Sequence, residues 1–300
     1  MPTHLRRGKE AHRFPVPGQR LQGPPAGPVP LTGPPRHALR VRIISLLSAA
    51  LLLSLTPARA NTLPDSMAAL MAAYPSQLKS ASGNTIVWHD GTAMQYDDGK
   101  ADKTFEEKLD HPDLEDQMSM PYPAGAAAAT VPAENSDPGR IRYDPFFKKM
   151  YGASRKDVEK NLAVIRWMPK TVNVPIRVTS VNDVHVRLQR VSDELDRLPD
   201  RLKRYVRTVS GSYVWRTIAG TERPSMHSFG IAIDIDARYA NYWMWDTPNR
   251  MGKFTFKNKI PREIVAIFEK QGFIWGGRWY HYDTMHFEFR PELLVRPAVH

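Results

Sequence analysis

The sequence predicts an α+β fold, in which a small antiparallel sheet is flanked by helices and carries a metal site. Apolar residues recur at steps of three and four over 184–198, and 261–272 starts with proline and ends with glycine. Both patterns are typical of amphipathic helices. Short apolar or alternating runs predict four strands: Tyr213–Arg216, Ile231–Asp236, Phe273–Trp275 and Met285–Phe289. These elements do not alternate regularly, so a parallel α/β sheet is not expected.

The first sixty residues have the pattern of a leader. Arginines precede an uncharged run, Ile43–Leu55, which is followed by Ala58-Arg59-Ala60. This order of charged, apolar and small residues predicts a secretory signal peptide cleaved after Ala60, and a periplasmic or secreted protein. The alternative is a short anchor that is not removed, although the run is shorter than the roughly 20 residues of a transmembrane helix. After cleavage we expect no stable membrane span.

Net charge and cysteine content exclude several classes of protein. The formal charge is +11, but residues 1–60 hold nine basic residues and one acidic residue, which leaves 33 basic and 30 acidic residues for the rest. A weak excess of this size does not predict nucleic-acid binding. Because the chain has no cysteine, disulfides, thiolate zinc sites and a cysteine nucleophile are excluded. A metal site must therefore use histidines and carboxylates.

Residues 61–140 are predicted to form a separate N-terminal region. Ser66–Tyr74 reads as a short helix that ends at a proline. Residues 85–96 read as a hairpin around Asp90-Gly91. The stretch 110–140 is rich in Pro, Ala and acidic residues without periodicity, so we expect an extended connection. A second region, residues 141–300, would hold the chemistry.

Two predicted strands and one loop offer metal ligands. In Ile231–Asp236 the isoleucines alternate with Ala232, Asp234 and Asp236, and in Met285–Phe289 His286 alternates with apolar residues. A loop before the first strand presents His227. Two imidazoles and one carboxylate with an open fourth position are typical of a catalytic zinc site. We therefore predict that one zinc ion per chain is bound by His227, Asp234 and His286.

Two further residues are candidates for the chemistry itself. Asp283 lies three residues before His286, where a general base would reach the same water. Arg216 lies eleven residues before His227 and would supply positive charge to a substrate carboxylate or an oxyanion. Each of these residues, taken alone, is more often structural than functional. The joint pattern makes the prediction.

The joint pattern resembles a known family. Ser225-Met-His227-Ser-Phe-Gly230-Ile-Ala232-Ile-Asp234 fills the S-x-H-x-x-G-x-A-x-D signature of the bacterial and phage zinc D-Ala-D-Ala carboxypeptidases and L-alanyl-D-glutamate peptidases. Phe273-Ile-Trp-Gly-Gly277 and Asp283-Thr-Met-His286-Phe287 resemble the second motif of that family. The resemblance covers about residues 180–290.

The resemblance implies a zinc metallopeptidase that cuts the peptide stems of peptidoglycan. It implies His227, Asp234 and His286 as zinc ligands and Asp283 as the base, and less specifically Arg216 as a substrate-binding residue. The cut would be that of an L-alanyl-D-glutamate endopeptidase or of a D-alanyl-D-alanine carboxypeptidase. The Asp at the base position resembles the L-alanyl-D-glutamate peptidase branch of the family. Arg278 stands where that branch often has an acidic residue after the two glycines.

Several alternatives remain open at this point. His281 is the rival metal ligand, and Glu288 and Asp236 are candidates to orient the imidazoles. Tryptophans and tyrosines near the site either pack in the core or line a substrate groove. A non-catalytic cell-wall-binding or assembly module with the same fold is the alternative function. Nothing in the sequence predicts the oligomeric state.

Overall fold

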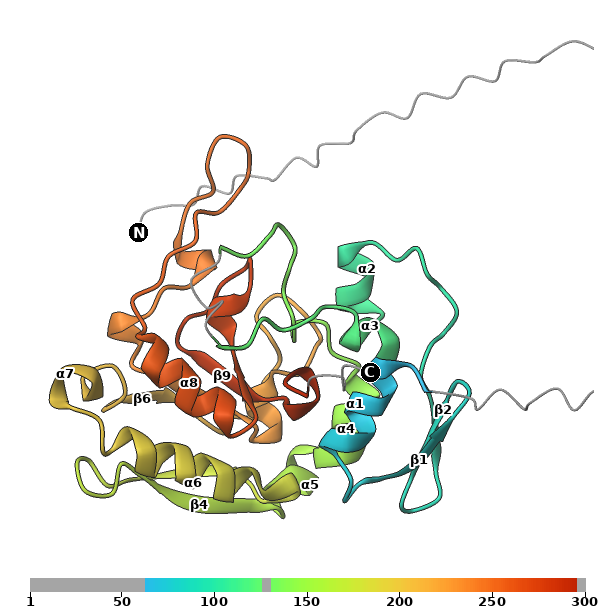
Figure 1. The fold of residues 1–300 in the computed structure, drawn as a ribbon, viewed down its shortest axis with the longest axis horizontal. Coiled ribbons are helices and arrows are strands. Elements are labelled where there is room, and N and C mark those ends of the chain that lie inside the picture. Colours follow the sequence, from blue (N-terminus) through green and yellow to red (C-terminus); the bar gives the residue numbers. More distant parts are fainter. Residues whose placement is uncertain (1–62, 126–130, 296–300) are drawn as a thin grey trace, which may run out of the picture. The chain divides into compact units, whose positions relative to one another are not determined.

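A computed structural model describes residues 63–125 and 131–295 of the chain (Figure 1). The predicted signal peptide and its cleavage site lie outside the described residues. Contacts divide the chain into residues 1–57 and 58–300, and all described residues belong to the second unit. In the described part of the chain, no helix has both the length and the apolar character needed to cross a bilayer.

The predicted N-terminal helix and hairpin are present, and a further strand, β1, precedes the hairpin. Helix α1 spans Asp65–Ala73, and strands β1 (Leu78–Ser82), β2 (Thr85–Trp88) and β3 (Ala93–Gln95) form an antiparallel sheet in this order. The turn between β2 and β3 contains Asp90 and Gly91, so the hairpin is confirmed. Asp90 accepts hydrogen bonds from the backbone and hydroxyl of Thr92, which closes this turn.

The expectation of an extended connection after Asp110 is wrong at its start. Helix α2 spans Phe105–Asp110, and helix α3 spans Leu114–Met118. Thr104 caps α2 and Asp113 caps α3, each in a reciprocal pair with the acidic residue three positions later. Helices of five or six residues are too short to show periodicity, so their capping boxes were the available signal.

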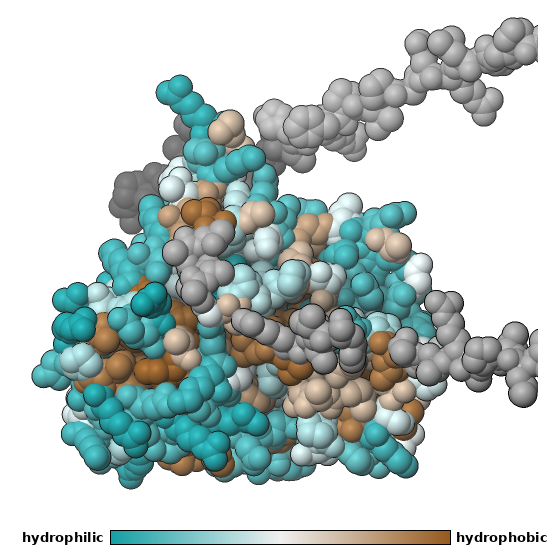
Figure 2. Space-filling view, viewed as in Figure 1, coloured by the Kyte–Doolittle hydropathy of each residue, from teal (hydrophilic) through white to brown (hydrophobic). Residues whose placement is uncertain are grey.

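The middle of the chain holds elements that the sequence analysis did not predict. Helices α4 (Asp144–Tyr151) and α5 (Arg155–Glu159) precede a hairpin of β4 (Leu162–Trp167) and β5 (Val174–Thr179). Helix α6 (Val184–Leu195) confirms the predicted amphipathic helix, and α7 (Asp200–Lys203) follows. Helix α6 packs against β4 and α8. On the face shown in Figure 2, hydrophilic side chains cover most of the region where α6 lies in Figure 1.

A four-stranded antiparallel sheet carries the predicted site. Its order is β6 (Val209–Gly211), β7 (Ala232–Ile235), β9 (His286–Phe289), β8 (Phe273–Trp275). Helix α8 (Arg262–Lys270) packs against β8. Strands β7, β8 and β9 and helix α8 confirm the predictions, and the mixture of helices with small antiparallel sheets is α+β.

The predicted strand Tyr213–Arg216 does not form. This segment is irregular and bonds to the loop that carries His227: Val214 N donates to His227 O, and Ser225 N donates to Arg216 O. The β6 ladder instead ends at Gly211, two residues before the predicted strand. Short apolar runs are ambiguous between strand and packed loop, and here tertiary packing decides.

Candidate metal centre

Strand pairing places two of the predicted ligands opposite each other. Asp234 on β7 pairs with His286 on β9 in the antiparallel ladder. Side chains of directly opposed residues share one face of a sheet. His227 comes from the 3-10 turn η3 (Met226–Phe229), where the Ser225 hydroxyl accepts a hydrogen bond from the His227 N–H. Two strands and one turn thus deliver the three residues to one point.

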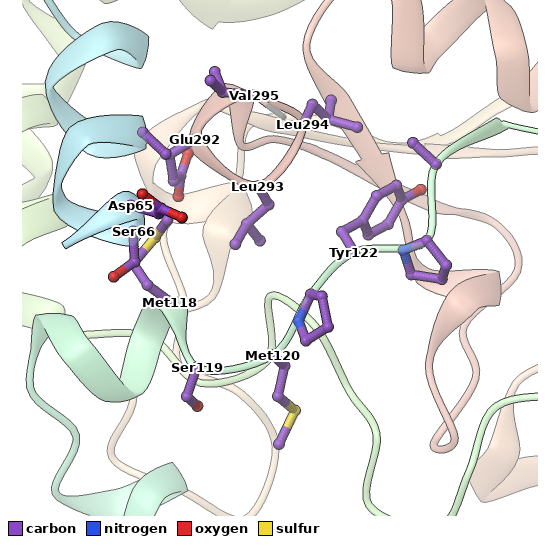
Figure 3. Close-up of a pocket in the computed structure, with 14 residues that line it drawn as sticks. Asp65, Ser66, Met118, Ser119, Met120, Tyr122, Glu292, Leu293, Leu294 and Val295 are labelled. Atoms are coloured by element: carbon purple, nitrogen blue, oxygen red, sulfur yellow. The ribbon is translucent and has the colours of Figure 1, made fainter. Parts of the chain in front are cut away.

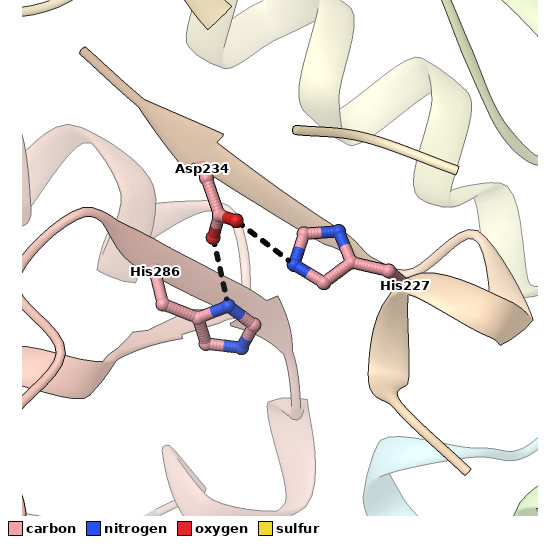
Figure 4. Close-up of side chains that lie close together, drawn as sticks. All are labelled: His227, Asp234 and His286. Atoms are coloured by element: carbon pink, nitrogen blue, oxygen red, sulfur yellow. Dashed lines mark hydrogen bonds and ion pairs between the residues drawn. The ribbon is translucent and has the colours of Figure 1, made fainter. Parts of the chain in front are cut away.

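The three side chains form one compact group (Figure 4). Asp234 Oδ2 lies 3.2 Å from His227 Nε2, and Asp234 Oδ1 lies 3.0 Å from His286 Nδ1. One ligand atom from each residue falls within 4.8 Å of the other two. Both histidines are buried and Asp234 is half-buried. Two ring nitrogens and one carboxylate at these separations are a donor set that suits zinc.

The far nitrogen of each imidazole is already occupied. His227 Nδ1 lies 2.7 Å from the carbonyl oxygen of Ser212, and His286 Nε2 lies 3.0 Å from Glu288 Oε2. A proton on each far nitrogen leaves the near nitrogen as a lone-pair donor. Glu288 therefore makes the contact expected of a residue that orients His286. Asp236 is buried but binds Arg238 instead, so it does not orient an imidazole.

Electrostatics at the group also suit a cation. Burial lowers the pKa of His286, but hydrogen bonds to Asp234 and Glu288 outweigh it and raise that pKa to about 9. Burial raises the pKa of Asp234, but hydrogen bonds from His227 and His286 leave it well below its usual range. The carboxylates thus favour positive charge at this point.

Asp283 lines the same cavity as the three residues. The cavity has a volume of about 420 Å³. The backbone of Asp283 is held by a hydrogen bond from its N–H to Gly276 O, and a Cβ at Gly276 would lie 2.5 Å from Asp283 O. This contact explains the glycine in the second motif. Asp283 Oδ1 is buried without a hydrogen-bond partner among the described residues, and burial raises the pKa of this carboxyl group.

The other candidate residues take different places. Arg216 lines the cavity, but its side chain is exposed and donates to Thr217 O. His281 also lines the cavity, yet it lies outside the group of three, and its Nδ1 contacts Asp137 Oδ2 at 2.6 Å. Arg278 is buried in an ion pair with Glu269 on α8. It therefore belongs to the scaffold rather than to the cavity.

The aromatic residues divide between the two roles that the sequence left open. Trp275 and Tyr282 are buried in the interior. Tyr242, Trp243 and Trp279 line the cavity.

Sequence reasoning missed one residue at the centre and several at its edge. Gly211 on β6 lies opposite Asp234, and a Cβ there would be 3.0 Å from Asp234 Oδ2 and 3.5 Å from His227 Cε1. Arg140 and Arg142 also line the cavity. No motif marks any of these residues, because each is brought to the site by chain pairing or packing.

A further cavity of about 470 Å³ lies elsewhere in the described part of the chain (Figure 3). It is lined by residues of α1, by 118–124 and by 292–295, and shares none of them with the first cavity. Of its carboxylates, Glu292 is already bonded to Tyr74 and Arg290. No histidine lines it, so the predicted chemistry does not belong there.

Residues 219–289 match the family model described as D-alanyl-D-alanine carboxypeptidase. This stretch contains His227, Asp234, Asp283 and His286, whereas Arg216 lies just before it. No curated protein shows a significant match to the chain, nor does any solved structure. The match confirms the resemblance of this segment to the zinc D-Ala-D-Ala carboxypeptidase family, and at family level it supports a metallopeptidase.

Proposed function

We propose that this protein is a zinc-dependent peptidase that cuts the stem peptides of peptidoglycan. The observation that carries the proposal is the meeting of His227, Asp234 and His286 beside Asp283 in one cavity. The family match over 219–289 supports it. The bond would be L-alanyl-D-glutamate or D-alanyl-D-alanine.

His227 Nε2, Asp234 and His286 Nδ1 would hold one zinc ion. The two imidazoles fit this role because Ser212 O and Glu288 occupy their other nitrogens. When bound, zinc would polarise the peptide carbonyl and make a water molecule more acidic. The protein supplies the remaining parts of the reaction.

Asp283 would act as general base and then as general acid. Its Oδ1 has no hydrogen-bond partner among the described residues and lies at the wall of the cavity. In this role it accepts a proton as the water oxygen bonds to the carbonyl carbon, and returns it to the nitrogen as the C–N bond breaks. Arg216, at the exposed edge, would bind substrate or stabilise the developing oxyanion.

We further propose that the chain is exported, cleaved after Ala60 and active in the periplasm or outside the cell, with residues 141–300 as the peptidase region. N-terminal sequencing of the exported protein locates the cleavage site. An intact leader would instead indicate an anchored form.

The experiment is mass spectrometry of peptidoglycan fragments incubated with the processed protein, with and without a chelator. Zinc content is measured on the same samples. We expect chelator-sensitive products whose masses distinguish loss of D-alanine from cleavage after L-alanine. Asp283→Asn should keep zinc and lose about a hundredfold or more in turnover, whereas His286→Ala should lose zinc.

Two results would contradict the proposal. Stoichiometric zinc in the His286→Ala protein would overturn the ligand assignment. One equivalent of zinc without product from any fragment would favour a non-catalytic cell-wall-binding module.

A further inference from the structure

The cavity beside the metal centre is strongly basic. Four arginines line it: Arg140, Arg142, Arg216 and Arg223. Its carboxylates are Asp234 and Asp283, and the proposed function uses both. A bound zinc ion would add further positive charge. The lining therefore carries more basic than acidic side chains, and outside it Glu288 pairs with Arg142 and Asp110 lies 3.7 Å from Arg223.

Three of these arginines carry buried donors without acceptors. The Nε atoms of Arg140, Arg142 and Arg223 are buried and have no hydrogen-bond partner in the described residues. For Arg223, the nearest carboxylate oxygen is Asp110 Oδ1 at 3.7 Å, which is beyond hydrogen-bond range. An unmet buried donor costs free energy, and three around one cavity indicate a missing acceptor.

The same arginines repel one another. Burial lowers the pKa of Arg223, and the nearby Arg142 acts in the same direction, while Asp110 and Asp144 oppose it. Burial also lowers the pKa of Arg140, and Arg142 acts in the same direction, while Asp137 and Asp283 oppose it. An anion between these guanidinium groups would relieve the repulsion.

Arg140 and Arg142 are held in place by the scaffold beside the metal group, and Arg223 is held by α2. Arg140 Nη2 donates to His281 O, and its guanidinium lies 4.5 Å from the Trp279 ring centre. Arg142 Nη2 donates to Glu288 Oε2 at 2.6 Å. Fixed guanidinium groups lose little entropy when they bind a ligand, and their planar donors match a carboxylate.

Helix α2 forms a wall of this part of the cavity. Phe105 and Leu109 line it, and Arg223 Nη1 donates to Leu109 O at the C-terminal end of the helix. Helix α2, Arg140 and Arg142 all precede the matched residues 219–289. The N-terminal region thus contributes directly to the cavity.

We propose that Arg140, Arg142 and Arg223, backed by α2, form a subsite that binds a free α-carboxylate on the amine-side residue of the scissile peptide bond. This inference rests on the proposed function. The two candidate bonds share that feature: the terminal D-alanine has a free α-carboxylate, and D-glutamate keeps one because its γ-carboxyl group joins the next residue. The subsite would serve either cut.

The test compares two peptide pairs, one ending in D-Ala-D-Ala and one containing L-Ala-D-Glu, each with its α-carboxylate free or amidated. Calorimetry on the processed, chelator-treated protein measures Kd without any need for turnover. We expect one pair to show a preference of about tenfold to a hundredfold for the free carboxylate, the range for a charge-assisted contact. Arg223→Gln should remove most of this preference, and Arg223→Lys should restore part of it.

The control is Arg207→Gln, which removes an arginine that pairs with exposed Asp200 outside the cavity and should leave the preference unchanged. Circular dichroism checks the fold of each variant. Equal affinity for acid and amide in the unmodified protein would overturn the subsite, as would an equal loss for both peptides in Arg223→Gln. Failure of the proposed function is separate, because it appears as absent turnover in the zinc-loaded protein.

Discussion

At the residue scale, small contacts set the geometry of the metal centre. His227 and His286 each have one nitrogen bonded to the scaffold and one directed at Asp234. Gly211 leaves the space in which Asp234 and His227 meet. A donor set displaced by a few tenths of an ångström binds a metal less well, so Gly211 matters although it donates nothing.

Gly211→Ala tests this point. The new methyl group would press on Asp234 Oδ2 at 3.0 Å, and we expect zinc affinity to fall about tenfold or more, within the range for outer contacts of metal sites. Competition with a chromogenic chelator measures the affinity. The matched control is Ser212→Ala, which keeps the carbonyl bonded to His227. Unchanged zinc affinity in Gly211→Ala would show that the strand yields to the methyl group.

The sequence predicted the group of three because Asp234 and His286 lie in alternating strands and His227 lies in the motif just before the first strand. It could not predict Gly211, Arg142 or Arg223, because their roles depend on what other segments place beside them. Arg278 departs from the pattern of the resembled family, and packing explains it by pairing Arg278 with Glu269.

At the element scale, a buried cation holds the two acidic residues that cap α3, and Lys108 of α2 pairs with one of them. Lys103, whose side chain is 6% exposed, lies 2.5 Å from Asp116 and 3.3 Å from Asp113, the capping residues of α3. Burial lowers the pKa of Lys103, but its hydrogen bonds to carboxylates, Asp116 first, outweigh this and raise it. The lysine therefore permits two acidic groups to be buried together.

Lys103→Met should destabilise the protein by about 1–3 kcal/mol, because it leaves Asp113 without its cation and Asp116 with Lys108 alone. Urea unfolding followed by circular dichroism measures the change. Lys100→Met is the control, since Lys100 is exposed and 4.0 Å from Asp98, and it should change stability by about 0.5 kcal/mol or less. A loss below about 1 kcal/mol for Lys103→Met would contradict the role assigned to this cation.

At the scale of the whole molecule, one core joins the N-terminal elements to the sheet. Met67 and Leu70 of α1 belong to the same buried cluster as Phe287 and Phe289 of β9. Buried hydrogen bonds and ion pairs run from Tyr74 through Glu292, Arg290 and Glu288 to His286. The N-terminal elements and the metal centre should therefore unfold together.

Alkaline pH should lower the stability of the N-terminal elements and the sheet together. Burial raises the pKa of Tyr96 from 10.0 to about 12, and burial also raises the pKa values of Tyr74 and Tyr122. A raised folded-state pKa contributes stability that is present below the unfolded value and lost as pH rises through the folded one. We expect these tyrosines to leave the free energy of unfolding, measured with urea, unchanged below pH 10. Above pH 10 the free energy of unfolding should fall.

Tyr96→Phe isolates one part of this effect. The variant should lose about 1 kcal/mol at neutral pH, because the bond from Tyr96 Oη to Ser66 Oγ is removed. Its stability should then fall less steeply above pH 10 than that of the unmodified protein. Parallel pH profiles for the two proteins would contradict the assignment to Tyr96.

The sequence by itself determined the α+β class, helices α1, α6 and α8, strands β7 to β9 and the three residues of the candidate metal centre. Local periodicity and motif spacing encode all of these. Only the tertiary structure decided that Gly211 makes room for Asp234, that 213–216 is irregular and that Arg140 and Arg142 share one cavity with Arg223, about 80 residues later. Such features arise from contacts between residues far apart in the chain. The free energy of a buried group depends on all of its neighbours, which no local pattern specifies.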